Sequence, residues 1–332
     1  MSVTIKRVAE LAGVSTATVS RVLNHSLRVA PEMRERVQRI IDENDYSPNM
    51  MGRNLRQLYT RKILVTLPHA SSPFFGSVLD GVEARANEYD YNVVVMATNQ
   101  SAERERFALD MLVTKQVDGA VLCLPITPVE ELERLSRNHP LVLACIGLDG
   151  SLVPLSNATI DAKRAIYDAV THCLQHGRQR VALMRGIVNT SVDVVAEQGY
   201  REALRDAGIP YCASLNKIGD TGFVGEAMCA DLMALPNAPD AIVTISDQLA
   251  IRCVRYLLKS GRVPGEDVDV LGFHDSPFAS LFMPALSTVS QPMRQIGEAA
   301  FDLLREKIQD IHSLVKTISL PYRIIHRETT RQ

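Results

Sequence analysis

Three short segments with apolar residues at helical spacing open the chain. The residues expected to be buried are Ile5, Val8, Ala9 and Leu11 in the first segment, Val19, Val22 and Leu23 in the second, and Met33, Val37, Ile40 and Ile41 in the third. Thr4 and Ser15 are placed to cap the first two helices, and Pro31 is suited to begin the third. The pattern therefore predicts a three-helix unit over residues 1–46.

From residue 62 onward, short apolar runs alternate with amphipathic stretches. Strands are expected at 63–67, 93–97, 120–124, 141–146, 159–160, 181–184, 241–245, 268–271 and 321–326, and helices at 75–89, 101–116, 162–176, 192–207, 222–234 and 247–260. This alternation is typical of parallel sheets with helices on both faces. About nine strands divide more readily into two sheets than into one. Segments 157–158 and 287–292 are candidate crossings between the lobes.

Charge is distributed unevenly along the chain. Residues 1–62 hold eleven Lys or Arg and six Asp or Glu, whereas the remaining 270 residues hold 25 and 32. A basic head on an acidic body is typical of a protein whose head meets a polyanion. Hydrophobic residues make up 46% and charged residues 22%, which excludes a disordered chain. No apolar run reaches 18 residues and the N-terminus lacks a secretory signal, so we expect a cytoplasmic protein with its six cysteines reduced.

The second expected helix presents side chains that a DNA-reading helix needs. Small polar or cationic groups near the N-terminus of such a helix reach base edges in the major groove. Thr16, Ala17 and Arg21 lie opposite the apolar residues of the segment, where an arginine can contact guanine and a methyl group can contact thymine. The alternative is an ordinary three-helix bundle with a polar surface.

Longer stretches of sequence resemble one family along nearly the whole chain. In the head they are TIKRVAELAGVSTATVSRVLN at 4–24, VAPEMRERVQRIIDENDYSPN at 29–49 and GRNLR at 52–56. In the core they are SPFFGSVLDGVE at 72–83, VDGAV at 117–121, GRVPGEDVDVLGFHDSP at 261–277 and PALSTVSQP at 284–292. Together they resemble the LacI/GalR family of transcriptional regulators, which includes the lactose and purine repressors. STATVSR, MGRN and TKQ-x-DG resemble its cytidine-regulator-like members.

The resemblance implies a homodimer whose helix-turn-helix heads bind a near-palindromic operator in double-stranded DNA. A hinge helix over about 49–56 would insert Leu55 into the minor groove, where an apolar wedge kinks a base step; alternatively, Leu55 packs on its own domain. Gly52 replaces the hinge's usual alanine and Ala30 replaces a capping serine, and both changes weaken helix formation. The expected DNA contacts are Thr4, Ser15, Thr16, Ala17, Thr18, Arg21, Asn24, Asn49, Arg53, Leu55 and Arg56.

The resemblance also implies the fold class: a small all-α helix-turn-helix head followed by an α/β core of two lobes, like that of periplasmic binding proteins. The expected domains are 1–46 for the head, 47–60 for the hinge, 61–160 plus about 291–319 for the N-lobe, and 161–290 plus about 320–332 for the C-lobe. No room is left after the expected final strand for a leucine-heptad segment, which favours a dimer over a tetramer.

Eight core positions correspond to effector-binding positions of the family: Ser72, Phe74, Phe75, Thr190, Ala196, Asp247, His274 and Asp275. Ala196 stands where the family usually has a ligand-clamping arginine, and His274 where it usually has an aspartate. The pocket is therefore either rebuilt for another small polar molecule, such as a sugar, sugar acid or nucleoside, or responds weakly to small molecules. His274 is either a donor to the ligand or an ordinary packed histidine.

Other functions lack a matching set of residues. A sugar- or nucleoside-processing enzyme would depend on Asp247, Asp275 and His274 alone, and we expect no enzymatic activity. A protein that binds solutes for import is not expected either, because such a protein would not need the basic head. His172 and His176 have a metal-compatible spacing without an evident third ligand, and no nucleotide-binding glycine motif occurs, so neither a metal nor a cofactor is expected.

Overall fold

The computed structural model describes residues 3–23, 28–46, 59–145, 154–186, 191–219 and 224–331, and the chain separates into two units, Met1–Thr60 and Arg61–Gln332. No helix in the described ranges is long and apolar enough to cross a membrane. The site residues expected from the sequence that lie outside the described ranges are Asn24, Asn49, Arg53, Leu55, Arg56 and Thr190.

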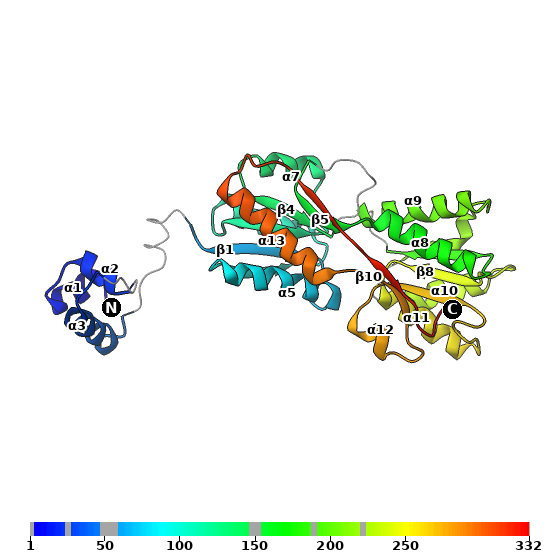
Figure 1. The fold of residues 1–332 in the computed structure, drawn as a ribbon, viewed down its shortest axis with the longest axis horizontal. Coiled ribbons are helices and arrows are strands. Elements are labelled where there is room, and N and C mark those ends of the chain that lie inside the picture. The colour runs from blue at the N-terminus through cyan, green and yellow to red at the C-terminus, as the bar shows by residue number, and fades with distance from the viewer. Residues whose placement is uncertain are drawn as a thin grey trace. The chain divides into compact units, whose positions relative to one another are not determined.

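The first unit contains three helices (Figure 1), which are α1 (Ile5–Ala12), α2 (Thr16–Leu23) and α3 (Pro31–Glu43). The Thr4 hydroxyl caps α1 by accepting the Arg7 N–H at 3.4 Å, and the Ser15 hydroxyl caps α2 by accepting the Thr18 N–H at 3.2 Å. Gly13 adopts a left-handed conformation with φ of 61°, which lets the chain turn sharply between α1 and α2. The local signals for caps and turn are thus confirmed.

A small apolar core holds the three helices together. The prediction that Leu11 is buried is wrong, because its side chain is 44% exposed and Ala12 is buried instead. At about 100° per residue, Ala12 lies between Val8 and Ala9 around the helix axis, whereas Leu11 points away from them. Ala30 makes no side-chain cap, as its chemistry predicts. The buried cluster comprises Val8, Ala9, Ala12, Val19, Val22, Val29, Val37 and Ile41.

The second unit contains two six-stranded sheets (Figure 1), and the first is parallel throughout. Its strand order is β11 (Thr317–Leu320), β5 (Asn157–Ile160), β4 (Leu141–Ala144), β3 (Gly119–Cys123), β1 (Lys62–Leu67) and β2 (Asn92–Ala97). One face packs on α5 (Pro73–Glu88) and α13 (Met293–Gln309), and the other on α6 (Ala102–Val113) and α7 (Val129–Ser136). Both faces are therefore buried, which explains the continuous apolar run of β1.

The second sheet has the order β12 (Arg323–Ile325), β10 (Ser287–Ser290), β9 (Asp269–His274), β8 (Ala241–Thr244), β6 (Val181–Arg185) and β7 (Asn216–Ile218). Only β12 is antiparallel to its neighbour among the described strands. One face packs on α8 (Ala162–Gln175) and α9 (Ser191–Asp206), and the other on α10 (Gly225–Met233) and α11 (Asp247–Lys259). A short helix, α12 (Pro277–Leu281), follows β9. We call the parts built on the first and second sheets the N-lobe and the C-lobe.

The chain passes between the lobes three times within the described residues: after β5, after β10, and between β11 and β12. The last passage is the red segment that runs diagonally in Figure 1. Residues 157–158 do not form the expected crossing, because both are paired within β5. The chain crosses after the end of that strand. Strands β7, β10 and β11 were not indicated by the sequence, since β7 and β11 are partly exposed edge strands and β10 is rich in Ser and Thr.

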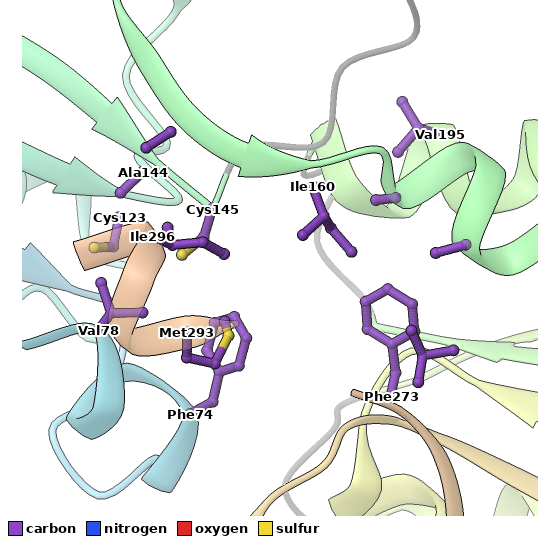
Figure 2. Close-up of a cluster of buried hydrophobic side chains, with 14 of the residues drawn as sticks. Phe74, Val78, Cys123, Ala144, Cys145, Ile160, Val195, Phe273, Met293 and Ile296 are labelled. Atoms are coloured by element: carbon purple, nitrogen blue, oxygen red, sulfur yellow. The ribbon is translucent and has the colours of Figure 1, made fainter. Parts of the chain in front are cut away.

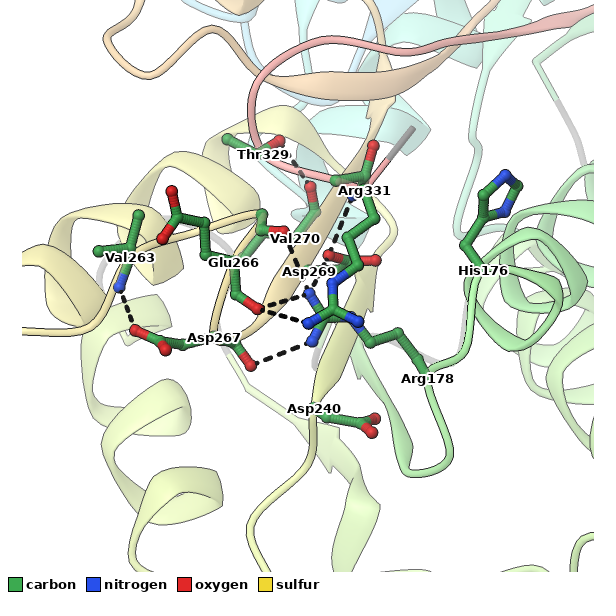
Figure 3. A network of polar contacts seen from close by, with 12 residues as sticks. His176, Arg178, Asp240, Val263, Glu266, Asp267, Asp269, Val270, Thr329 and Arg331 are labelled. Carbon is green, nitrogen blue, oxygen red and sulfur yellow. Dashed lines mark hydrogen bonds and ion pairs between the residues drawn. The ribbon is translucent and has the colours of Figure 1, made fainter.

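A buried ion pair fixes the C-terminal segment to the C-lobe (Figure 3). The Arg178 guanidinium donates to the Asp269 carboxylate at 2.6 Å, and both side chains are almost fully buried. The same arginine donates to the backbone carbonyls of Gly265, Glu266 and Asp267. The Arg331 N–H also donates to Asp269. Because buried charge is costly without partners, this network ties the chain end to the start of β9.

Close contact between α5 and α13 generates a prediction about N-lobe stability. A methyl group at Gly81 would lie 2.0 Å from the Arg294 carbonyl oxygen, whereas one at Gly76 on the same helix would meet nothing within 4 Å. Gly81→Ala should therefore lower the free energy of unfolding by roughly 2–4 kcal/mol, because two helix backbones would have to separate. The matched Gly76→Ala should raise it by up to about 1 kcal/mol. Urea unfolding of both variants measures the difference, and equal stabilities would contradict the close packing.

Candidate functional site

The outer face of α2 carries the side chains expected to read DNA. Val19 and Val22 are buried against the other helices, which turns Thr16, Ala17 and Arg21 outward, where all three are exposed. A cationic side chain and a methyl group thus project together from the first turns of a helix, an arrangement suited to a major groove. The hydroxyls of Thr4, Ser15 and Thr18 are engaged in the caps of α1 and α2, at helix ends whose N–H groups favour phosphate oxygens.

A pocket of about 900 Å³ lies between the two lobes. It is lined by the ends of β5, β8 and β9 and by the first turns of α5, α8 and α11. The carboxyl ends of parallel strands are where open α/β sheets bind ligands, because loops and helix N-termini converge there. Figure 2 shows Phe74 and Phe273 pointing toward this region from the N-lobe and the C-lobe, with Ile160 at the crossing between them.

The first turn of α5 forms the N-lobe wall of this pocket. Ser72 is the N-cap residue but makes no side-chain capping bond, and Pro73 occupies the first helical position. Phe74 and Phe75 follow, with ring centroids 4.7 Å apart in an edge-on arrangement. This wall therefore combines aromatic surface with the positive end of a helix dipole.

His274 contacts Phe74 across the lobes. The two ring centroids are 3.9 Å apart, and His274 has φ of 117°, a conformation that favours glycine. Burial lowers the pKa of His274 to about 3, so the imidazole is neutral at physiological pH. A neutral ring can donate one hydrogen bond to a ligand but supplies no positive charge.

Asp247 supports the loop that follows β9. Its two carboxylate oxygens accept the Ser276 N–H and the Thr288 hydroxyl, both at 2.6 Å. A methyl group at Gly272 would lie 2.4 Å from the same carboxylate, so the glycine leaves room for it. Burial raises the pKa of Asp247, although these hydrogen bonds oppose the shift. Asp247 thus lies in the pocket wall, and its main role there is to position residues 274–276.

The structure separates the eight expected effector positions. Ser72, Phe74, Phe75, Asp247 and His274 line the pocket together. Asp275 instead forms an ion pair with Arg327 at 2.7 Å and lines a neighbouring pocket of about 480 Å³. Ala196 is buried in the apolar core of the second unit and does not line the larger pocket. Thr190 lies outside the described residues.

Several polar lining residues were missed from the sequence. Gln248, Arg252 and Arg255 occupy one stripe of α11, at i, i+4 and i+7, and all three line the pocket. The polar stripe opposite the buried face of α11 is the sequence pattern that could have indicated these residues. Gln291 lies at the second crossing, and its Nε2 is buried with no hydrogen-bond partner among the described residues. Such a group offers a donor to a bound molecule.

A third histidine lies beside His172 and His176. His326 lies beside them, with its ring centroid 4.2 Å from that of His172, while His172 and His176 are 4.0 Å apart. The planes of these rings are inclined to one another by 35–41°. No group of three His, Cys, Asp or Glu in the described ranges could hold a metal ion. All six cysteines, each of which is described, are free thiols.

Comparison with known proteins identifies the two units separately. Residues 60–328 match the family described as periplasmic binding proteins and sugar binding domain of LacI family, and residues 4–49 match bacterial regulatory proteins, lacI family. The chain is 32% identical to the HTH-type transcriptional repressor PurR of Vibrio atlanticus (strain LGP32), and the match covers 99% of this chain and 98% of that protein. It is 31% identical to the HTH-type transcriptional repressor CytR of Escherichia coli (strain K12), with 99% and 96% covered.

A solved structure extends the similarity to ligand-bound relatives. The transcriptional regulator CelR–cellobiose complex is 29% identical, with 98% of this chain and 99% of that chain covered and a TM-score of 0.74. The identities to PurR and CytR differ by one percentage point, so they do not single out a cytidine-regulator subfamily.

The neutral state of His274 predicts a dependence of stability on pH. Its pKa is about 3 in the folded chain and near 6.5 when unfolded, so unfolding takes up a proton below pH 6.5. The contribution of the neutral His274 to the free energy of unfolding is fully present above pH 6.5. It falls as the pH is lowered, by at most about 2 kcal/mol at pH 5. His274→Phe keeps the aromatic contact and should show a shallower loss in urea unfolding between pH 7 and pH 5. His312→Gln, at an exposed position, should follow the parent chain; identical slopes for all three proteins would contradict the assignment.

Proposed function

Because this chain belongs to the LacI family of bacterial regulatory proteins, we propose that it is a repressor whose affinity for operator DNA is set by a small polar effector bound between the lobes of its core. The family makes it a DNA-binding transcriptional regulator rather than an enzyme. The observation that carries the proposal is the 900 Å³ interlobe pocket in a chain that also has an exposed reading helix. Its place of action is the chromosome in the cytoplasm.

In this proposal the reading helix α2 enters the major groove of each operator half-site. Arg21 contacts a guanine, and the methyl groups of Thr16 and Ala17 contact thymines. Thr4, Ser15 and Thr18 place helix N-termini at phosphates. The roles of the remaining expected contacts rest on the family resemblance: Asn24, Asn49, Arg53 and Arg56 at the operator, and Leu55 as the wedge in the minor groove.

The effector would act by changing the angle between the lobes. The pocket is bounded by both lobes and by the crossings, so a molecule that fills it favours one relative orientation. By linkage, any effector that changes operator affinity must have its own affinity changed by operator in the same ratio. The cellobiose bound to CelR is consistent with a polar ligand of sugar size.

A second candidate function is a regulator of the same family that does not respond to a small molecule. Two observations favour it: the buried Ala196 removes the family's ligand-clamping cation, and the neutral His274 replaces an aspartate. In that case the abundance of the protein or a protein partner would set repression.

The homodimer is proposed from an apolar surface on the C-lobe. In and beside α12, the exposed fractions of Phe278, Leu281 and Met283 are 57%, 79% and 85%. Exposed apolar groups gathered on one short segment typically mark an interaction site. We assign this surface to a second copy of the chain, because a paired operator needs two heads.

Loss of Arg21 should alter sequence preference as well as affinity. Arg21→Ala is expected to weaken operator binding by about 5- to 100-fold and to relax discrimination at one base pair of each half-site. Arg36→Ala, an exposed arginine of α3, is the control and should leave discrimination unchanged. Binding to a library of operator variants at fixed salt measures both effects. An Arg21→Ala protein with unaltered base preference would exclude direct reading by this side chain.

A charge in the apolar surface of α12 should dissociate the dimer. Leu281→Glu buries a carboxylate at the proposed interface and is expected to raise the dimer dissociation constant by at least about 10-fold. Leu314→Glu, at a residue 78% exposed in the loop before β11, is the matched control. Sedimentation velocity over a range of concentrations distinguishes the two. If Leu281→Glu sediments like the parent chain, α12 is not the interface.

A further inference from the structure

Three histidine rings lie in contact where the chain, after its third passage between the lobes, reaches α8. His172 and His176 come from the C-terminal end of α8, and His326 directly follows β12. The ring centroid of His172 is 4.0 Å from that of His176 and 4.2 Å from that of His326. His172 is buried, whereas His326 is exposed. We call these three residues the histidine cluster; through it, a surface segment packs on a buried ring of α8.

The buried ring of the cluster is held in its neutral form. The Nε2 atom of His172 is buried and has no hydrogen-bond partner among the described residues, so a proton added there would lack an acceptor. Burial, followed by the charges of His326 and His176, lowers the pKa of His172 to about 4. Burial and then the charge of His176 also lower the pKa of His326. Proton uptake by the cluster is therefore opposed while the rings remain packed.

The acidic groups around the cluster have other partners. Asp269 of β9 opposes the lowering of the His172 pKa, but its carboxylate accepts the buried Arg178 guanidinium at 2.6 Å. Asp240, before β8, accepts two backbone N–H groups that precede β6. Cys173, next to His172 on α8, is a buried free thiol. No carboxylate in the described ranges forms an ion pair with a ring of the cluster, so protonated rings would lack a counter-charge.

The segment that carries His326 is held at the edge of the C-lobe. Strand β12 is an edge strand that pairs with β10 over three residue pairs. The Tyr322 hydroxyl donates to the Asp168 carboxylate of α8 at 2.6 Å, and Arg164 contacts the same carboxylate at 2.9 Å. Residues 321–328 can therefore separate from the C-lobe while its central strands stay paired.

The residue after His326 joins this segment to the wall of the interlobe pocket. Arg327 forms an ion pair with Asp275 at 2.7 Å. Asp275 directly follows His274, whose ring contacts Phe74 of the N-lobe. A displacement of His326 is therefore transmitted through the next residue to the loop that presents His274 to the pocket.

We propose that the histidine cluster is a proton-sensitive contact: protonation releases residues 321–328 from α8 and loosens the pocket loop at 274–276 through Arg327. When the segment separates, His172 meets water and binds a proton, and the charged rings then repel one another. The segment continues directly from the third passage between the lobes, so the cluster adds a proton-dependent control of lobe geometry that needs no effector.

Proton binding by His172 sets the direction and the size of the effect. Its pKa is about 4 in the packed cluster and returns to near 6.5 when the ring is hydrated. The resulting stabilisation of the packed segment is complete above pH 6.5 and is lost as the pH falls toward 4. Between pH 7.5 and pH 5.5, the equilibrium constant for opening should rise about 10-fold from His172 alone.

Hydrogen–deuterium exchange of the full chain tests the release. Protection factors, corrected for the intrinsic pH dependence of exchange, are compared by mass spectrometry at the two pH values. Peptides that cover 321–328 should lose protection about 10-fold at the lower pH, and peptides that cover 274–276 should lose protection with them. Strand β3 of the N-lobe should keep its protection.

Phenylalanine variants assign the loss of protection to the cluster. His172→Phe keeps an aromatic ring in the buried position but cannot bind a proton, so it should abolish most of the loss. His326→Phe, at an exposed position, should reduce the loss because one of the repelling charges is absent. His139→Phe removes a partly buried histidine of the N-lobe whose pKa is also lowered by burial, and this matched control should behave as the parent chain.

The parent chain alone decides the first step, even if a variant fails to fold. Unchanged protection of 321–328 at the lower pH overturns the proposal, and so does an equal loss across the whole C-lobe, because that loss would report global unfolding. An equal loss in His172→Phe would assign the proton to another group and overturn the role of the cluster. Loss at 321–328 without loss at 274–276 would overturn the transmission through Arg327.

Discussion

The three passages of the chain between the lobes are the constraint on which the rest of the core depends. Neither sheet is complete from a continuous stretch of sequence: the N-lobe sheet takes β11 from near the C-terminus, and the C-lobe sheet takes β10 and β12 from beyond the other C-lobe strands. The crossings hold the carboxyl ends of the two sheets toward one pocket. Since three adjacent connections permit rotation more easily than separation, the core is suited to a change in lobe angle.

The pocket itself is built from contacts that join distant parts of the chain. Asp247 at the start of α11 fixes the loop after β9 through Ser276 and Thr288, and this loop presents His274 to Phe74 of the other lobe. A buried carboxylate thus holds a neutral aromatic contact between the lobes. Burial shifts the pKa of each group toward its neutral form.

The head is stabilised in a different way from the core. Its apolar cluster is small, and caps at Thr4 and Ser15 support helices of only eight residues. The stability of the head therefore depends on this small cluster and on the caps, and the outer face of α2 is left free to carry polar groups. The basic charge of residues 1–62 and the acidic charge of the rest favour DNA contact through the head alone.

Local features of the protein could be predicted from the sequence because they depend on neighbours along the chain. Helical spacing, caps at Thr4 and Ser15, and the apolar runs of the central strands all belong to this class, and family motifs placed Ser72, Phe74 and Phe75 at the ligand position. The exposed Leu11, the edge strands β7 and β11, and the third histidine His326 did not follow from the pattern. The sequence by itself determined the family, the helix-turn-helix head and the alternation of strands and helices. Only the tertiary structure decided which loops converge on the pocket, that Asp275 pairs with Arg327 instead, and that Arg252 and Arg255 line it. The reason is that such contacts join residues tens to hundreds of positions apart, and side-chain periodicity carries no information about those partners.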